Sequence, residues 1–208
     1  GEDQLNARTG KSMGGFFEAI TTFTQVRRDV YGEVHPDAAR LENMQLVELA
    51  SAPFSKPRYQ AVAKALDLQP EQLKAASMEE AYERYYARNL NASSLVAYGA
   101  MLENLVRGEL LSAQSRALLY DDMKLGSYDN YRLEAGLPED VPFIQKTGTQ
   151  LERACHVGVI EPQDATRAIV VVACAEALDE GSEAGRLFEQ VGQAISQNGS
   201  YITGALAG

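Results

Sequence analysis

Two β-branched segments near the C-terminus constrain the fold of this 208-residue chain more than any other feature. Residues 155–160 and 168–175 are short, apolar and rich in valine and isoleucine, and residues 161–166 between them contain proline and aspartate. Strand-length runs joined by such a loop are typical of a β-hairpin. A symmetric hairpin predicts three directly opposed pairs: Val159 with Val170, Val157 with Val172, and Cys155 with Cys174.

The residues before Pro138 have helical periodicity instead. The expected helices have apolar faces at Phe16, Ile20, Phe23 and Val30 (ending at Gly32), at Leu41, Met44 and Leu49 (after Pro36), at Tyr59, Val62 and Leu66, and at Leu73 (after Pro70). Two more are capped by Ser93 or Ser94 and by Ser112, with apolar faces at Leu95, Tyr98, Leu102 and Leu105 (ending at Gly108) and at Leu118, Leu119 and Met123 (ending at Gly126).

A third strand is expected at residues 143–148, and a last helix is expected to turn Leu187, Phe188, Val191 and Ile195 inward. The sequence therefore predicts an α+β fold, in which a helical subdomain precedes an antiparallel sheet flanked by a C-terminal helix. We expect one domain over residues 1–208. It is mainly helical over 1–137, carries the strands and last helix over 138–197, and ends in an irregular tail over 198–208.

Composition excludes several functional classes. The net charge is −10 and the pI is about 4.7, without a cluster of Lys and Arg, so we expect no nucleic-acid partner. No stretch approaches the roughly 20 apolar residues of a membrane span. Two cysteines and two histidines, without the spacing of metal ligands, favour neither a metal site nor a cofactor.

The tripeptide Lys146-Thr147-Gly148 lies on the first expected strand. Before it come the segment 93–112, which ends in Gly-Glu-Leu-Leu-Ser, a second helix, and residues 131–138. In this order the chain resembles class A β-lactamases and related penicillin-binding proteins from about residue 90 to residue 196. A lone Lys-Thr-Gly has little specificity, but the surrounding helix-helix-strand-hairpin-helix order makes it informative.

The resemblance implies roles for four neighbouring residues. Lys146 attracts the substrate carboxylate as a candidate catalytic residue, and the hydroxyl of Thr147 hydrogen-bonds the same carboxylate. Gly148 lets the substrate lie against the strand, and the Thr149 backbone N–H serves as an oxyanion-hole donor. The alternative is a strand entry with a solvated lysine.

The nucleophile of that family, the serine of Ser-x-x-Lys, has no counterpart in the chain, because no serine has lysine at the third following position. Ser12, with Gly15 in place of the lysine, marks either a lost motif or a plain helix start. Ser55, the second candidate catalytic residue, is either a degenerate form of the family's Ser-x-Asn or part of a turn before a helix. Ser127-Tyr-Asp-Asn130 is interpreted as a turn.

Several other residues have competing interpretations. Glu79, Glu80 and Glu83 occupy the region of the family's water-activating glutamate, but the usual Glu-x-x-Leu-Asn is absent, so a solvated helix face is the simpler interpretation. Cys155 and Cys174 either form a cross-strand disulfide in an oxidising periplasm or stay free thiols, and free thiols are expected because directly opposed cysteines pair with strain. We expect His156 to face away from Cys155 on the sheet surface, and the tyrosines of residues 82–86 to pack between helices.

Three functional hypotheses follow from the resemblance. In the first, the chain is the C-terminal part of a longer serine hydrolase that acts on β-lactams, D-Ala-D-Ala peptides or esters. In the second, it is a catalytically silent relative that binds a partner or a cell-wall peptide. In the third, the resemblance is accidental and the chain is an unrelated α+β binding domain. The family implies two further strands, so the sheet is expected to be incomplete and to be completed by a homo-oligomer or an N-terminal segment. The expected location is periplasmic or secreted.

Overall fold

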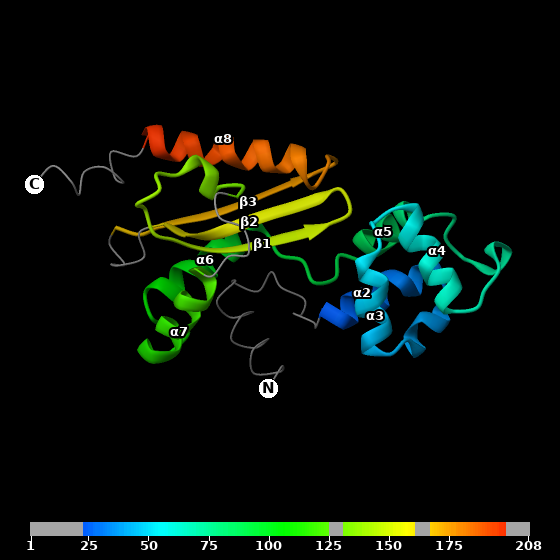
Figure 1. Cartoon of the computed structure of the whole chain (residues 1–208). Helices are drawn as coiled ribbons and strands as arrows, with labels where there is room; N and C mark the ends of the chain where they lie inside the picture. The colour runs from blue at the N-terminus through cyan, green and yellow to red at the C-terminus, as the bar shows by residue number, and fades with distance from the viewer. Residues whose placement is uncertain (1–22, 125–130, 161–166, 199–208) are drawn as a thin grey trace, which may run out of the picture. The chain divides into compact units, whose positions relative to one another are not determined.

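The computed structural model describes residues 23–124, 131–160 and 167–198. These residues form two compact units, which divide between Ser93 and Ser94 and are drawn in Figure 1. Residues 23–93 form a helical unit, and the described residues from 94 onward form a sheet unit. Phe16, Ile20, Ser12, Gly15, Gly126, residues 127–130, the hairpin loop 161–166 and the tail after Asn198 lie outside the described residues.

The helical unit is built around its first described helix, α2. Its elements are α2 (Phe23–Val34), η1 (Pro36–Arg40), α3 (Asn43–Ser51), α4 (Lys56–Ala65), η2 (Pro70–Gln72) and α5 (Met78–Ala87). Helix α2 packs against η1, α3, α4 and α5. Tyr82 and Tyr85 are buried, which confirms the expected packing of the tyrosine-rich segment between helices.

Two expected boundaries in this unit were wrong. Helix α2 continues through Gly32 to Val34 and ends before Pro36, where His35 Nδ1 accepts a hydrogen bond from the Asp37 N–H. Pro36 starts a short 3₁₀ helix rather than a long α-helix, and a new helix begins at Asn43. Because α3 restarts the helical phase, Met44 is 75% exposed while Leu49 is buried.

The sheet unit confirms the predicted α+β class. Its elements are α6 (Leu95–Val106), α7 (Ala113–Lys124), η3 (Glu134–Gly136), β1 (Phe143–Gln150), β2 (Arg153–Ile160), β3 (Ile169–Glu176) and α8 (Ser182–Asn198). The strands pair antiparallel in the order β1-β2-β3. The register of β2 and β3 places Val159 opposite Val170 and Cys155 opposite Cys174, as predicted.

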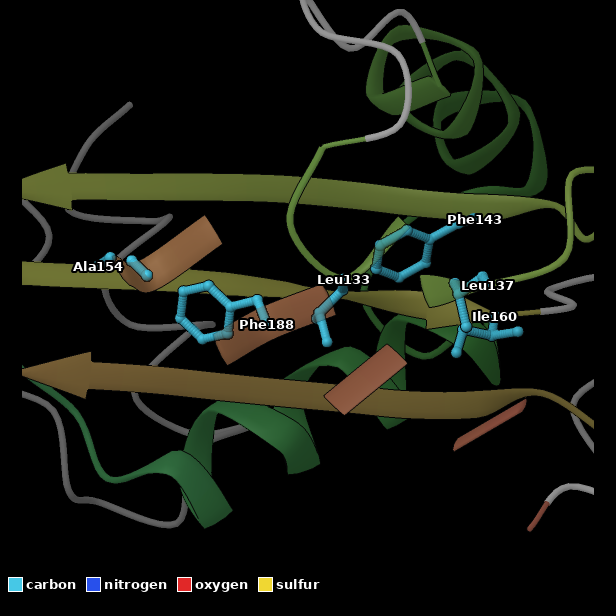
Figure 2. Packing of buried hydrophobic residues seen from close by; sticks show 7 residues of the cluster. Leu133, Leu137, Phe143, Ala154, Ile160 and Phe188 are labelled. Atoms are coloured by element: carbon cyan, nitrogen blue, oxygen red, sulfur yellow. The ribbon is translucent and has the colours of Figure 1, made fainter. Parts of the chain in front are cut away.

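Helices cover both faces of this sheet (Figure 1). Helices α6 and α7 pack on one face, and α8 with η3 covers the other. On the α8 face, Phe188 and Leu133 meet Phe143 and Ile160 in a buried cluster, seen from close by in Figure 2. Burial of each such side chain stabilises the fold by roughly 1.5–3 kcal/mol.

Helix α8 approaches η3 more closely than its apolar pattern predicts. A Cβ on Gly192 would lie 2.2 Å from the Leu133 carbonyl oxygen, and a Cβ on Gly136 would lie 2.2 Å from the Glu189 carbonyl oxygen. Each glycine is therefore required by the contact. This contact fixes the segment before β1 against α8.

Three leucines expected on buried faces are exposed: Leu95 by 47%, Leu118 by 61% and Leu187 by 41%. Leu95 is the first residue after Ser94, which caps the helix by accepting a hydrogen bond from the Ala97 N–H at 3.1 Å. The inward face of α8 consists of Ala184, Phe188, Val191 and Ile195. The positions of apolar residues in the sequence were therefore not sufficient to predict which side of each helix is buried.

None of the helices in the described parts of the chain combines the length and the apolar character that a membrane crossing requires.

Candidate functional site

Strand β1 changes its surroundings halfway along its length. Phe143, Ile144 and Gln145 are buried, whereas Lys146, Gly148 and Thr149 are exposed. The first half is therefore enclosed, and the second half reaches solvent. Alternate residues face opposite sides of a strand, so Lys146 and Gly148 share one face while Thr147 and Thr149 share the other. The structure thus brings all four predicted residues together on one exposed strand end.

This strand end is also an edge of the sheet, because β1 pairs only with β2 among the described strands. Lys146 lies opposite Val157 and donates a hydrogen bond to the Thr147 carbonyl oxygen. Its ammonium forms no ion pair among the described residues. An exposed cation at an open strand edge can bind a carboxylate without displacing an acidic partner.

The two cysteines form a disulfide, so the expectation of free thiols was wrong. Cys155 and Cys174 are directly opposed on β2 and β3, with Cα atoms 4.1 Å apart. A Cβ on Gly148 would lie 3.8 Å from the Cys155 Cβ. Neighbouring strands thus place the disulfide beside Gly148, on the Lys146 face of the sheet.

A buried arginine holds the opposite face of the same strand end. Arg132 is 2% exposed. Its Nη1 donates to the carbonyl oxygens of Gly148 at 3.1 Å and Cys155 at 2.9 Å. Its Nη2 donates to Thr149 Oγ1 at 3.0 Å and to the Glu180 carbonyl oxygen at 3.0 Å. One guanidinium therefore joins β1, β2 and the turn before α8.

His156 lies on the same face as Arg132 and is fully buried, so its expected place on the sheet surface was wrong. It faces away from Cys155, as predicted, but α8 and η3 cover that face. Its Nδ1 accepts from the Leu133 N–H at 3.0 Å, so Nε2 carries the proton and donates to Gln145 Oε1. Gln145 in turn donates to Glu134 Oε2 at 2.8 Å.

The pKa of His156 is lowered to about 4, mainly by burial and further by the charges of Arg132 and Lys146. The imidazole is therefore neutral at neutral pH. With both ring nitrogens in hydrogen bonds inside the core, it supports the strand and is not placed to exchange protons with a substrate.

Ser55 belongs to the helical unit, whereas Lys146 belongs to the sheet unit. Ser55 is exposed and directly precedes α4, where its carbonyl oxygen accepts from the N–H groups of Arg58 and Tyr59. Its side chain makes no capping hydrogen bond. The geometry within the helical unit is that of a turn before a helix, and a catalytic role for Ser55 stays a prediction.

Of the three glutamates considered for water activation, Glu79, Glu80 and Glu83, Glu80 has a defined structural contact. It accepts a hydrogen bond from the Ala76 N–H at 2.6 Å and pairs with Arg84. These contacts, first the backbone hydrogen bond and then Arg84, lower the pKa of Glu80. Glu80 thus stabilises the first turn of α5, while Glu83 is exposed on the same helix.

A shallow groove lies in the helical unit. Its lining includes Arg28, Glu33 and Arg88. Arg88 pairs with Glu33 at 3.0 Å, and Arg28 donates to Asn43 Oδ1 at 2.8 Å. Because these charges already bind neighbouring groups, the groove resembles a solvated surface more than a ligand site.

Sequence reasoning missed Arg132, Gln145 and the burial of His156. The available signal was a lone arginine between the apolar positions of residues 131–138, since an arginine there is rarely buried without a specific set of acceptors.

The sequence model described as the β-lactamase enzyme family matches residues 45–198. This range includes both candidate catalytic residues, Lys146 and Ser55. No curated protein matches the chain in sequence.

Several solved structures are similar in fold. A mutant of PBP-A, solved as an acyl-enzyme complex with penicillin G, is 17% identical with a TM-score of 0.46, and the alignment covers 68% of this chain and 55% of that chain. An ancestral class A β-lactamase is 19% identical with a TM-score of 0.47, covering 91% and 79%. A β-lactamase from Sphaerobacter thermophilus is 14% identical with a TM-score of 0.44, covering 100% of both chains.

The structural likenesses are distant, and the assignment rests on the sequence model, which spans well over half of the chain. The chain belongs to the β-lactamase enzyme family.

Proposed function

We propose that the chain serves a β-lactamase-related serine hydrolase by binding the carboxylate of a β-lactam, a D-Ala-D-Ala peptide or a related ester along the exposed end of β1. The observation that carries this proposal is the glycine at position 148. A Cβ there would meet only Cys155 Cβ at 3.8 Å, an ordinary van der Waals distance. Packing does not require glycine at this position, but a ligand lying against the strand does.

The proposed substrate lies along the free edge of β1. The Lys146 ammonium attracts its carboxylate, and the Thr147 hydroxyl donates a hydrogen bond to the same group. The Thr149 N–H then points at the oxygen of the reacting carbonyl, where negative charge develops during acyl transfer. Lys146 and Gly148 approach from one face and the two threonines from the other, so the edge is where all four groups converge.

A second candidate function is a catalytically silent binding domain. It is favoured by the sequence, in which none of the serines has a lysine at the third following position. Without that lysine against the serine, no adjacent base takes the proton of the hydroxyl. The same strand end then binds the carboxylate of a cell-wall peptide without acyl transfer.

We further propose that the outer edge of β3 is covered in the working protein, by a second copy or by an N-terminal segment. Within the described residues β3 pairs only with β2, and it presents Ile169, Val170, Val171 and Val172 with few charges. Open apolar edges recruit further strands. The Cys155–Cys174 disulfide supports an oxidising location, periplasmic or extracellular.

Intact-mass spectrometry with penicillin G tests the proposed function. A serine hydrolase gains the mass of penicillin G, and peptide mapping identifies the acylated serine, with Ser55 as one candidate. Calorimetric titration with the same ligand detects binding without an adduct, which selects the silent binding domain. Absence of both an adduct and binding, at millimolar penicillin G and with a cell-wall pentapeptide, contradicts both functions.

Lys146→Ala is the informative variant, with Lys124→Ala as its matched control. Both lysines are exposed and both lie in the sheet unit, but Lys124 pairs with Asp121 on α7. We expect Lys146→Ala to lose acylation or binding and Lys124→Ala to retain it.

A further inference from the structure

Arg132 has an unusual combination of burial, charge and backbone conformation. Its side chain is 2% exposed, and its backbone has a φ of 56°, in the left-handed region that L residues rarely adopt. None of the ion pairs among the described residues involves this guanidinium. It binds four neutral oxygens, and its Cζ lies 5.0 Å from the Tyr131 ring centroid and 5.6 Å from that of Phe188. A buried cation without an anionic partner is a costly way to hold a sheet together. Its location therefore calls for a reason beyond packing.

Two of the four acceptors of Arg132 belong to the residues that flank the peptide bond between Gly148 and Thr149. Nη1 binds the Gly148 carbonyl oxygen at 3.1 Å, and Nη2 binds Thr149 Oγ1 at 3.0 Å. The two nitrogens of one rigid fork thus hold both ends of this peptide unit. The remaining bonds, to the carbonyl oxygens of Cys155 and Glu180, anchor the fork to β2 and to the turn before α8.

Because the peptide bond is planar, these hydrogen bonds also determine the direction in which the Thr149 N–H points. Nη1 reaches both the Gly148 and the Cys155 carbonyl oxygens, so the Gly148 carbonyl points toward β2. In a trans peptide, C=O and N–H point in opposite directions. The Thr149 N–H therefore points away from β2, toward the free edge of β1 where the proposed substrate lies.

We propose that Arg132 is a positioning residue, which fixes the peptide unit between Gly148 and Thr149 so that the Thr149 N–H meets the developing oxyanion of the substrate. The inference rests on the proposed function, because it assigns the N–H to the reacting carbonyl. Arg132 lies on the covered face of the sheet and does not touch the substrate. Its effect is on the chemical step, since a preorganised donor lowers the barrier only if it is aligned beforehand.

The test compares Arg132→Lys with Arg116→Lys. Lysine keeps the charge at position 132 but loses the two-nitrogen fork. Arg116 is a matched control in the same unit, because its Nη1 also donates to a backbone carbonyl oxygen, that of Val106 at 2.7 Å, at the end of α6. A third variant, Thr149→Val, removes only the side-chain acceptor at an exposed position, so it preserves the fold.

The first measurement is the reaction with penicillin G, followed as the acylation rate constant and the dissociation constant. We expect Arg132→Lys to lower the acylation rate constant at least about 30-fold, less than the roughly 100- to 1000-fold for outright loss of one oxyanion donor because the N–H is misaligned and not removed. The dissociation constant should change less than about threefold. Thr149→Val is expected to give a smaller loss, and Arg116→Lys none. An unchanged acylation rate constant in Arg132→Lys, or an equal loss in Arg116→Lys, overturns the proposal.

The second measurement needs no substrate and separates this proposal from the proposed function. The backbone order parameter and amide shift of Thr149 are measured by ¹⁵N NMR in the same variants. We expect Arg132→Lys to lower the Thr149 order parameter below about 0.6, the level of a flexible backbone, while Arg116→Lys leaves it rigid. A rigid, unshifted Thr149 in Arg132→Lys overturns the positioning role even if penicillin G binds. Failure of the wild type to bind penicillin G, with a loosened Thr149 in Arg132→Lys, contradicts the proposed function and the oxyanion role of the N–H, but supports Arg132 as the residue that fixes this peptide unit.

Discussion

The two halves of strand β1 have the same backbone geometry but opposite surroundings. Phe143 to Gln145 are enclosed by helices and hydrogen-bonded through Gln145 to His156, whereas Lys146 to Thr149 reach solvent. Two glycines, one on β2 beside the first half and one on β1 in the second half, differ in the same way. Gly158, opposite Gln145, leaves no room for a side chain, while Gly148 is a glycine where a side chain would fit. Close packing constrains the residues at Phe143 to Gln145, whereas the residues from Lys146 to Thr149 are available to bind a ligand.

The largest expected effect is that of Gly158→Ala in the buried half. A Cβ there would lie 2.3 Å from the Ile144 carbonyl oxygen and 2.6 Å from a ring carbon of Phe143. Because backbone must move, we expect the free energy of unfolding to fall by about 3 kcal/mol, measured by urea denaturation. Gly148→Ala is the control and should change stability by less than about 1 kcal/mol. Equal losses in the two variants would remove the distinction between the halves.

A pH dependence of stability is expected from His156. Its folded pKa of about 4 lies below the ordinary value of 6.5, so below pH 6.5 the unfolded state binds the proton more readily. The stability that neutral His156 contributes to the folded state is fully present above pH 6.5. It is lost as the pH falls toward 4, and the loss levels off below that pH. Between pH 7 and pH 4.5 the loss amounts to roughly 2 kcal/mol.

The measurement is urea unfolding of the wild type and of His156→Gln at several pH values. The carboxyl groups titrate in both proteins. The difference between their two curves of unfolding free energy against pH therefore isolates the effect of His156. If the difference in the free energy of unfolding between the two proteins stayed constant from pH 7 to pH 4.5, His156 would have the same pKa in the folded and unfolded states.

Removal of the disulfide tests the exposed half of the sheet. The bond closes a loop with a sequence separation of 19 residues, for which chain entropy alone predicts about 3 kcal/mol. Because strand pairing already joins β2 and β3, we expect only about 1–2 kcal/mol from Cys155→Ser with Cys174→Ser, measured as a shift in Tm. A loss above that of Gly158→Ala would place the main stabilisation of the sheet in its exposed half.

The smallest effect on stability is expected from Lys146→Ala. The exposed ammonium has no ionic partner among the described residues, so the free energy of unfolding should change by less than about 0.5 kcal/mol. Affinity for penicillin G should nevertheless fall at least about tenfold, as for loss of a hydrogen bond to a charged group. Calorimetric titration and thermal unfolding of the same sample measure both quantities. A destabilised variant with unchanged affinity for penicillin G would show that Lys146 stabilises the fold and does not bind the ligand.

Much of the fold could be predicted because its signals are local. The β-branched runs predicted the hairpin register from Val159–Val170 to Cys155–Cys174, and the pair Ser93 and Ser94 marked the start of α6, which Ser94 caps. The Lys146 motif was found for the same reason, since its four residues are consecutive on one strand. Predictions that concerned the covered side of a helix, such as those for Met44 and Leu118, failed because they depend on what packs there.

The sequence by itself determined the α+β class, the strand pairing and the residues of the exposed strand end, since these follow from periodicity and chain order. Only the tertiary structure decided that His156 is buried and neutral, that Cys155 and Cys174 are bonded, and that Arg132 lies beneath the Gly148–Thr149 peptide unit. The physical reason is that strand alternation gives the face to which a side chain points. Whether that face is covered, and by which charge, depends on segments distant in the chain that meet only in the folded protein.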